Sequence, residues 1–182
     1  MYVIAHLTQL RQLDQKIKTN DFNKLETTQK EIKELIGNEP CTRIPWAMVF
    51  AVFFTMLSVV GPYILWFEII TGDHISTDNE NIIYKPELLI FILVLITAVH
   101  YLAKGFYHGL LALAGIWFMS FCIAVSGSLI TLFNYEHYIT SGGVALSSMG
   151  MIFGSLSFLL FNRKTTYKYI LFAYHNRILR KK

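Results

Sequence analysis

The reactive side chains of this sequence do not stand at the spacings that catalysis requires. A membrane serine protease needs a Gly-x-Ser nucleophile with a histidine at the same depth, but Ser155 follows Gly154 directly and the histidines lie outside the apolar centres. Thiol exchange needs two neighbouring cysteines. Cys41 precedes the first apolar segment and Cys122 lies within the third, so we interpret both as free thiols. These residues predict no catalytic site.

Metal, phosphate and proton chemistry are disfavoured by the same kind of argument. His100 and His108 bracket a turn instead of sharing one helix face, and no glycine-rich phosphate loop is present. A proton-coupled transporter usually carries an ionisable residue at the middle of the bilayer. Here Glu68, His100, Lys104 and His108 all lie near the ends of apolar segments. The sequence therefore predicts neither an enzyme nor a transporter, and no cofactor or metal.

The composition is that of a membrane protein. Of the 182 residues, 54% are hydrophobic and 15% are charged, whereas about a quarter of a soluble chain is charged. Residues 1–43 and 163–182 hold 14 of the 16 lysines and arginines, and residues 44–162 hold only Lys85 and Lys104. This distribution excludes a soluble enzyme, a disordered chain and a disulfide scaffold. The chain is expected to be all-α, with two terminal segments and no independent domains.

Four segments are apolar enough for spanning helices, which need about 20 mostly apolar residues. They are Ile44–Ile70, Glu87–Ala103, Phe106–Phe133 and Gly142–Phe161. Seven lysines and arginines precede the first segment, seven follow the last, and Lys104 lies in the turn between the middle two. The opposite side carries only Lys85, a tally of 15 against 1. The positive-inside rule therefore predicts a four-span bundle in the bacterial inner membrane with both termini cytoplasmic.

Small residues form a stripe along the last predicted span. The stripe, spaced 4, 3, 4 and 3, consists of Gly143, Ser147, Gly150, Gly154 and Ser157. A weaker stripe in the third span consists of Ser120, Ala124 and Ser128, with Gly105 and Gly109 at its inner end. Such stripes allow another helix backbone to approach closely. Two interpretations stay open: the third span packs on the fourth, or a second subunit packs there in a homo-oligomer.

The first predicted span contains Gly61 and Pro62 about two-thirds of the way along. Proline lacks a backbone N–H and clashes with the preceding turn, so this pair predicts a kink.

Residues 1–36 show two apolar stripes at helical period. The stripes consist of Val3, Leu7, Leu10, Leu13 and Ile17, and of Phe22, Leu25, Gln29, Ile32 and Ile36. Asn20 and Asp21 offer a cap between them, and Gly37 and Pro40 end the second. So short a segment cannot bury a core alone. We expect this helical pair to pack against the membrane surface, symmetry mates or a partner protein.

The tail 163–182 is predicted to be a basic amphipathic helix. Its apolar residues are Tyr167, Ile170, Leu171, Tyr174 and Ile178, among seven basic ones. This pattern suits an anionic inner leaflet or a groove on a partner, and the basic charge is explained by topology without nucleic acid. The predicted lipid or partner contacts of both terminal segments are Leu7, Leu10, Leu25, Ile32, Arg163, Lys164, Lys168, Arg177 and Arg180.

The plan of four spans, cytoplasmic ends, a helical N-terminal pair and a basic tail resembles the small membrane subunits of bacterial anti-phage systems of the Kiwa type. The resemblance implies a homo-oligomeric sensor that holds a cytoplasmic effector. The plan is also similar to immunity proteins against pore-forming colicins. A third hypothesis is a holin-like channel, whose lining would be Ser120, Ser126, Ser128 and Thr131. The leading expectation is a non-enzymatic, homo-oligomeric subunit that anchors or senses for a cytoplasmic effector.

Overall fold

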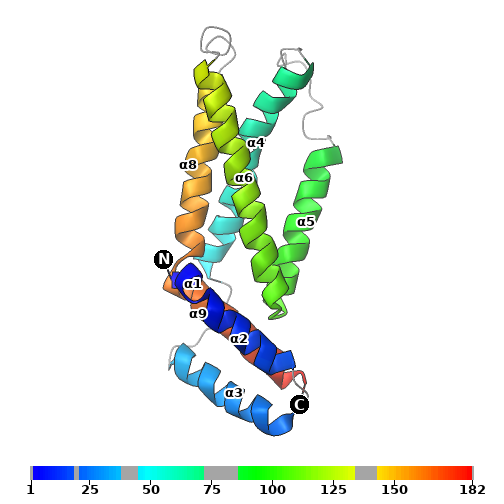
Figure 1. Ribbon diagram of the computed structural model, residues 1–182, viewed down its shortest axis with the longest axis vertical. Helices are drawn as coiled ribbons and strands as arrows, with labels where there is room; N and C mark the ends of the chain where they lie inside the picture. The colour runs from blue at the N-terminus through cyan, green and yellow to red at the C-terminus, as the bar shows by residue number, and fades with distance from the viewer. Residues whose placement is uncertain (1, 19–20, 38–44, 72–85, 134–142, 182) are drawn as a thin grey trace. The chain divides into compact units, whose positions relative to one another are not determined.

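A computed structural model describes residues 2–18, 21–37, 45–71, 86–133 and 143–181. These residues form eight helices and contain no strand (Figure 1). In chain order the helices are α1 (Tyr2–Ala5), α2 (Leu7–Lys18), α3 (Phe22–Ile36), α4 (Trp46–Thr71), α5 (Pro86–Ala103), α6 (Tyr107–Phe133), α8 (Gly143–Phe161) and α9 (Lys164–Leu179). The predicted all-α class is confirmed.

Three helices are long and apolar enough to cross a bilayer. They are α4 over Trp46–Trp66, α5 over Pro86–Ala103 and α6 over Tyr107–Phe133. In α8 the apolar stretch of the described residues is Ser148–Phe161, which is shorter than a spanning helix requires. Three of the four predicted spans are therefore supported by the structure, and the fourth stays a prediction. Residues 72–85 and 134–142, together with Asn20, Pro40, Cys41 and Ile44, lie outside the described residues.

The ends of the helices follow from local chemistry. Asp21 caps α3 by accepting a hydrogen bond from the Asn23 amide at 3.1 Å, and Gly37 ends α3 at φ +71°. These are the cap and the stop that the sequence predicts. Proline begins α5 at Pro86, where its missing N–H has no intrahelical acceptor to lose.

The chain packs as two compact units. The terminal unit combines Met1–Phe50, Ile96–Ala114 and Leu159–Lys182, and the central unit combines Ala51–Leu95 with Gly115–Phe158. Both ends of the chain therefore share one unit with the adjoining ends of α5 and α6.

In the terminal unit, α9 is the central helix and contacts α1, α2 and α3 (Figure 1). Its buried residues are Thr166, Tyr167, Tyr169, Ile170, Leu171, Ala173, Tyr174, Arg177 and Ile178. The other three helices add Val3, Leu10, Leu13, Ile17, Leu25 and Ile32, which belong to the two predicted stripes. The tail therefore differs from the predicted surface helix, because its apolar residues are covered on several sides by the N-terminal helices.

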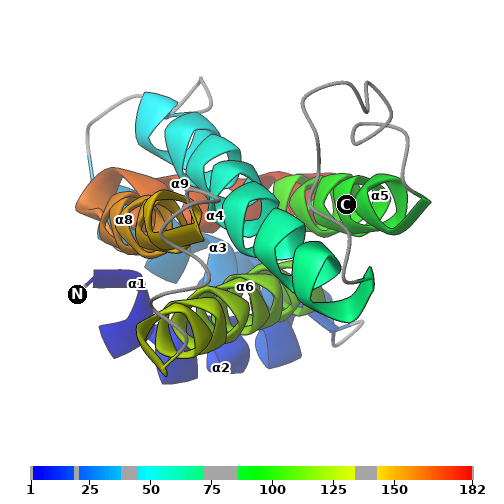
Figure 2. The ribbon, with the colours of Figure 1, turned by 90° about the horizontal axis from the view of Figure 1, so that it is seen from above.

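In the central unit, α4 crosses α8 at close range (Figure 2). A Cβ atom at Gly61 would collide with the backbone carbonyl of Leu146. A Cβ at Gly150 would come within 2.5 Å of the Pro62 ring and 3.0 Å of the Ser58 carbonyl. Gly61 and Pro62 thus lie at a helix crossing, and α4 continues through the proline. The kink predicted at this pair stays a prediction.

Hydroxyl groups extend this crossing. The Ser157 hydroxyl donates a hydrogen bond to the Ala51 carbonyl at 2.8 Å and pairs with the Thr55 hydroxyl at 2.7 Å. Helix α6 contacts α8 as well, since the Trp117 indole donates a hydrogen bond to the Gly154 carbonyl at 2.9 Å. Gly150, Gly154 and Ser157 of α8 therefore make contacts within the chain.

Candidate functional site

The site is built around the turn that joins α5 to α6. Gly105 stands there at φ +78°, in the left-handed region that glycine adopts without steric cost. The amides of Lys104, Gly105 and Phe106 donate to carbonyls in the last turn of α5, at 3.0, 2.9 and 3.0 Å. This is the usual glycine ending of a helix, and it reverses the chain within a few residues.

The same turn lies directly against the backbone of α9. A Cβ atom at Gly105 would collide with the Ala173 carbonyl oxygen and stand 3.1 Å from the Tyr174 amide nitrogen. A Cβ at Gly109 would collide with the Leu102 amide nitrogen of α5. Gly105 and Gly109 belong to the weaker predicted stripe. Gly105 allows α9 of the same chain to approach closely, and Gly109 does the same for α5.

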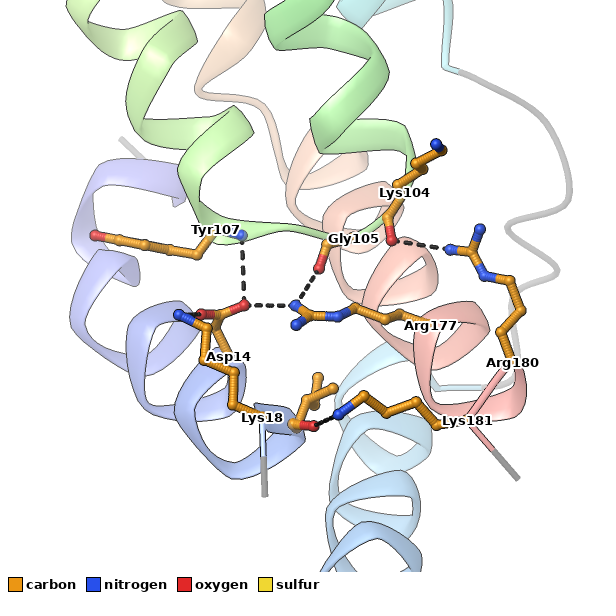
Figure 3. Close-up of polar contacts among 9 residues, drawn as sticks. Asp14, Lys18, Lys104, Gly105, Tyr107, Arg177, Arg180 and Lys181 are labelled. Carbon is orange, nitrogen blue, oxygen red and sulfur yellow. Dashed lines mark hydrogen bonds and ion pairs between the residues drawn. The ribbon is translucent and has the colours of Figure 1, made fainter. Parts of the chain in front are cut away.

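A buried ion pair between α2 and α9 also contacts the turn (Figure 3). Arg177 Nη1 donates to Asp14 Oδ1 at 2.6 Å and to the Gly105 carbonyl at 2.9 Å. The guanidinium also lies 4.2 Å from the centre of the Phe106 ring, close enough for a cation–π interaction. The Tyr107 amide points at Asp14 Oδ1 at 3.5 Å, which is long for a hydrogen bond.

Two further cations of the tail hold helix ends. Arg180 Nη2 donates to the Lys104 carbonyl at 2.9 Å, and Lys181 Nζ donates to the Ile17 carbonyl of α2 at 2.7 Å (Figure 3). Carbonyls at helix C-termini lack intrahelical partners and carry partial negative charge. Each cation therefore satisfies an acceptor at the end of another segment. We call Asp14, Ala173, Arg177 and Arg180, which surround the turn 104–107, the turn socket.

The Asp14 carboxylate is ionised at neutral pH. Burial raises the pKa of Asp14, but the hydrogen bonds and charges of Arg177 and Lys18 outweigh it, so the pKa of Asp14 lies below its ordinary value. Lys18 Nζ stands 3.1 Å from Asp14 Oδ2. The side chains of Asp14 and Arg177 are only 4% and 9% exposed, so each charge depends on the other.

Tyr174 is a fully buried phenol beside this pair. Its hydroxyl has no hydrogen-bond partner among the described residues. Burial raises the pKa of Tyr174, and the nearby charge of Asp14 raises it further. The phenol is therefore neutral, and its unpaired hydroxyl lowers the stability of the folded unit.

The N-terminus is fastened at the junction of α8 and α9. The amides of Tyr2 and Ile4 donate to the backbone and side-chain oxygens of Asn162, at 3.0 and 3.2 Å. The His6 ring packs against the Tyr2 and Tyr167 rings, with both centroid distances at 4.9 Å. This attachment places α1 against the start of α9.

The residues predicted to contact lipid or a partner fall into two groups. Leu10, Leu25, Ile32 and Arg177 are buried within the terminal unit. For these four the structure replaces the predicted contact with packing inside the chain, because α9 supplies the covering surface. Arg180 binds a carbonyl of the turn. A second group remains open to solvent or partly so, and consists of Leu7, Lys168, Arg163 and Lys164.

Other helices of the same chain contact the described residues of the predicted oligomer stripe. Gly150 faces Pro62 and Ser58, and Gly154 lies against Phe121 and Ser58. Ser120 and Ala124 are buried, and Ser128 donates to the Ala124 carbonyl and to Met151 Sδ. The surroundings of Gly143 and the side chain of Ser147 lie outside the described residues. The fourth predicted span thus packs on the first as well as on the third.

Sequence reasoning missed Asp14. The signal was present, because Asp14 is an acidic residue next to Leu13 within the apolar stripe of α2. Its partner Arg177 lies 163 residues away, beyond the reach of helical periodicity. Among the described residues no cluster of histidine, cysteine, aspartate and glutamate could hold a metal ion. The arrangement supports a structural joint, since its charges pair with one another and with backbone.

Comparison with models of protein families, with curated proteins and with solved structures finds no match to this chain.

Proposed function

We propose that this protein is a non-enzymatic membrane subunit that presents the terminal unit to a cytoplasmic protein partner. In this proposal α8 is a fourth span, and both ends of the chain lie in the cytoplasm of a bacterium. The positive-inside distribution of lysine and arginine supports that orientation. The partner is an effector whose position or activity depends on the membrane subunit, as in an anti-phage system.

The observation that carries the proposal is the core of the terminal unit. A chain needs only scattered positive charges to fix its topology. Here the two ends of the chain instead form a common core around α9, with a buried ion pair and a fastened turn. Buried charges are costly, so this structure favours a platform of defined shape over a loose topological anchor.

The contacts of the central unit favour this function over a channel. The hydroxyls of Ser120, Ser126, Ser128 and Thr131 each donate to a carbonyl of their own helix, at 2.7 to 2.9 Å. In a water-filled pore, those hydroxyls would instead face the water or ions of the pore. An oligomer stays part of the proposal, but the α8 stripe does not support it, because α4 and α6 occupy that face.

The experiment compares partner retention in matched variants. The protein is co-expressed with the product of a neighbouring gene, extracted in mild detergent and purified through a tag. Arg177→Gln removes the central cation of the socket, and Lys30→Gln removes a cation from an exposed pair with Glu26. Both variants lose one positive charge, so net charge is matched.

We expect the partner to co-purify with the wild type and with Lys30→Gln, and to be lost with Arg177→Gln. Equal retention by both variants, or no retention by any of them, contradicts the proposal. An immunity protein gives a different result, since protection from one toxin would survive deletion of residues 1–36. Labelling of either terminus from outside intact cells would overturn the orientation.

A further inference from the structure

The helix α5 offers a broad apolar surface to its surroundings. Leu89, Ile90, Val94 and Ile96 are 49% to 60% exposed. Between Glu87 and the inner end of the helix at His100 there is no charged residue. In a spanning helix this surface meets lipid chains. The bilayer therefore acts directly on α5.

The length of α5 makes it sensitive to bilayer thickness. Its 18 residues extend about 27 Å at a rise of 1.5 Å per residue. The hydrocarbon core of a bilayer is about 30 Å thick. A helix shorter than the hydrocarbon core is matched by local thinning of the bilayer, whereas a helix longer than the core tilts. We therefore expect α5 to tilt in thin bilayers, which displaces its inner end.

Within the terminal unit, side chains of α2 and of the tail contact the turn that follows this inner end at four consecutive residues. Arg180 binds the Lys104 carbonyl, Arg177 binds the Gly105 carbonyl and covers the Phe106 ring, and Asp14 faces the Tyr107 amide. The backbone of α9 fills the space beside Gly105. A turn held in this way cannot bend without breaking the hydrogen bonds that Arg177 and Arg180 donate to its carbonyls.

We propose that the turn socket makes the inner ends of α5 and α6 and the terminal helices move as one body, so that bilayer thickness sets the position of the terminal unit. The proposal concerns this chain alone and needs no partner, so it can fail while the proposed function holds. In this proposal the socket has a positioning role. When the bilayer displaces α5, the turn transmits that displacement to α9 and α3.

The test measures a distance across the socket in bilayers of different thickness. Spin labels are attached at Lys33→Cys on α3 and Leu111→Cys on α6, both exposed positions, after replacement of Cys41 and Cys122 by alanine. The protein is reconstituted into phosphatidylcholine vesicles with acyl chains of 14, 18 or 22 carbons. Pulsed electron resonance gives the distance distribution, and quenching of a fluorophore at Lys33→Cys by headgroup nitroxides gives the approach of α3 to the membrane.

For the wild-type background we expect one narrow distance in all three bilayers, together with quenching that changes with thickness. Arg177→Gln should broaden the distribution of the spin-label distance and make it depend on bilayer thickness, because the ion pair is lost. Gly105→Ala should have the same effect, because the added Cβ collides with α9. Lys30→Gln should behave as the wild type. Gly105→Ala retains the charges of Asp14 and Arg177. If both socket variants give the same result, that result comes from loss of the contacts at the turn and not from a change in charge.

A wild-type distance that varies with thickness would overturn the proposal. So would quenching that is constant across the three bilayers, or narrow and constant distances in both socket variants. If neither socket variant inserts, the two wild-type measurements decide the matter.

Discussion

Replacement of Arg177 by methionine tests the central contact of the terminal unit. The change removes the charge that faces Asp14 and the donor that binds the Gly105 carbonyl, and it keeps a long apolar side chain. Asp14 is 3% exposed, so its carboxylate stays in a poorly solvated place. Breaking one side of a buried ion pair costs about 3–5 kcal/mol. Lys18 still faces Asp14 at 3.1 Å, so we expect the lower end, about 3 kcal/mol of folding free energy.

Amide hydrogen exchange of α9, measured on the protein in nanodiscs at neutral pH, reports this loss. Since every 1.4 kcal/mol is a factor of ten, exchange in α9 should accelerate by about two orders of magnitude. Lys24→Met is the matched control, because Lys24 forms an exposed pair with Asp21 at 3.7 Å. Such pairs are worth about 0–1 kcal/mol, so its exchange should change at most about fivefold.

The double variant Asp14→Leu with Arg177→Met separates a lost charge partner from lost packing. Replacing both members of a buried pair by apolar residues is often neutral or stabilising, so most of the protection in α9 should return. If the exchange rates of α9 in Arg177→Met lie within threefold of those in Lys24→Met, the reasoning is refuted, because the Asp14–Arg177 pair would then be solvated. Equal losses in the single and double variants would show that packing alone was affected.

The remaining predictions concern pH, the buried phenol and the helix crossing. Because the pKa of Asp14 is lowered on folding, the stabilisation that Asp14 gives to the folded state is complete above the unfolded pKa of about 3.9. This stabilisation is lost as the pH falls through the lower folded pKa. Asp14→Asn should therefore remove the corresponding part of the acid unfolding curve, measured by near-ultraviolet circular dichroism. Tyr174→Phe should raise folding stability by about 1 kcal/mol, since it removes an unpaired buried hydroxyl. Tyr167→Phe, on the same helix, should lower it by about 1 kcal/mol because its hydroxyl donates a hydrogen bond at 2.9 Å. Changes of equal sign in thermal scans would contradict one of these two predictions. Gly150→Ala should lower the unfolding temperature by forcing α4 from α8, whereas Gly115→Ala, where a Cβ meets nothing within 4 Å, should not; the reverse order would place the crossing elsewhere.

Much of the fold could be read from the sequence because it depends on local patterns. Apolar length identified α4, α5 and α6, and the capping residues Asp21 and Gly37 marked the ends of α3. Helical periodicity also identified buried residues of α2 and α3, among them Leu10 and Ile32. Each of these signals lies within about one helix of the residue that it concerns.

The tertiary structure alone decided what covers each apolar face. Periodicity shows that Leu10 or Ile170 lies on an apolar face, and it is silent on whether lipid, a partner or the same chain lies opposite. The small residues of α8 likewise allow any backbone to approach closely, and here the backbone carbonyl of Ser58 and the ring of Pro62, both in α4, lie beside Gly150. Asp14 and Arg177 meet across 163 residues, because the topology brings both chain ends to one turn, and such a pairing depends on every element between them.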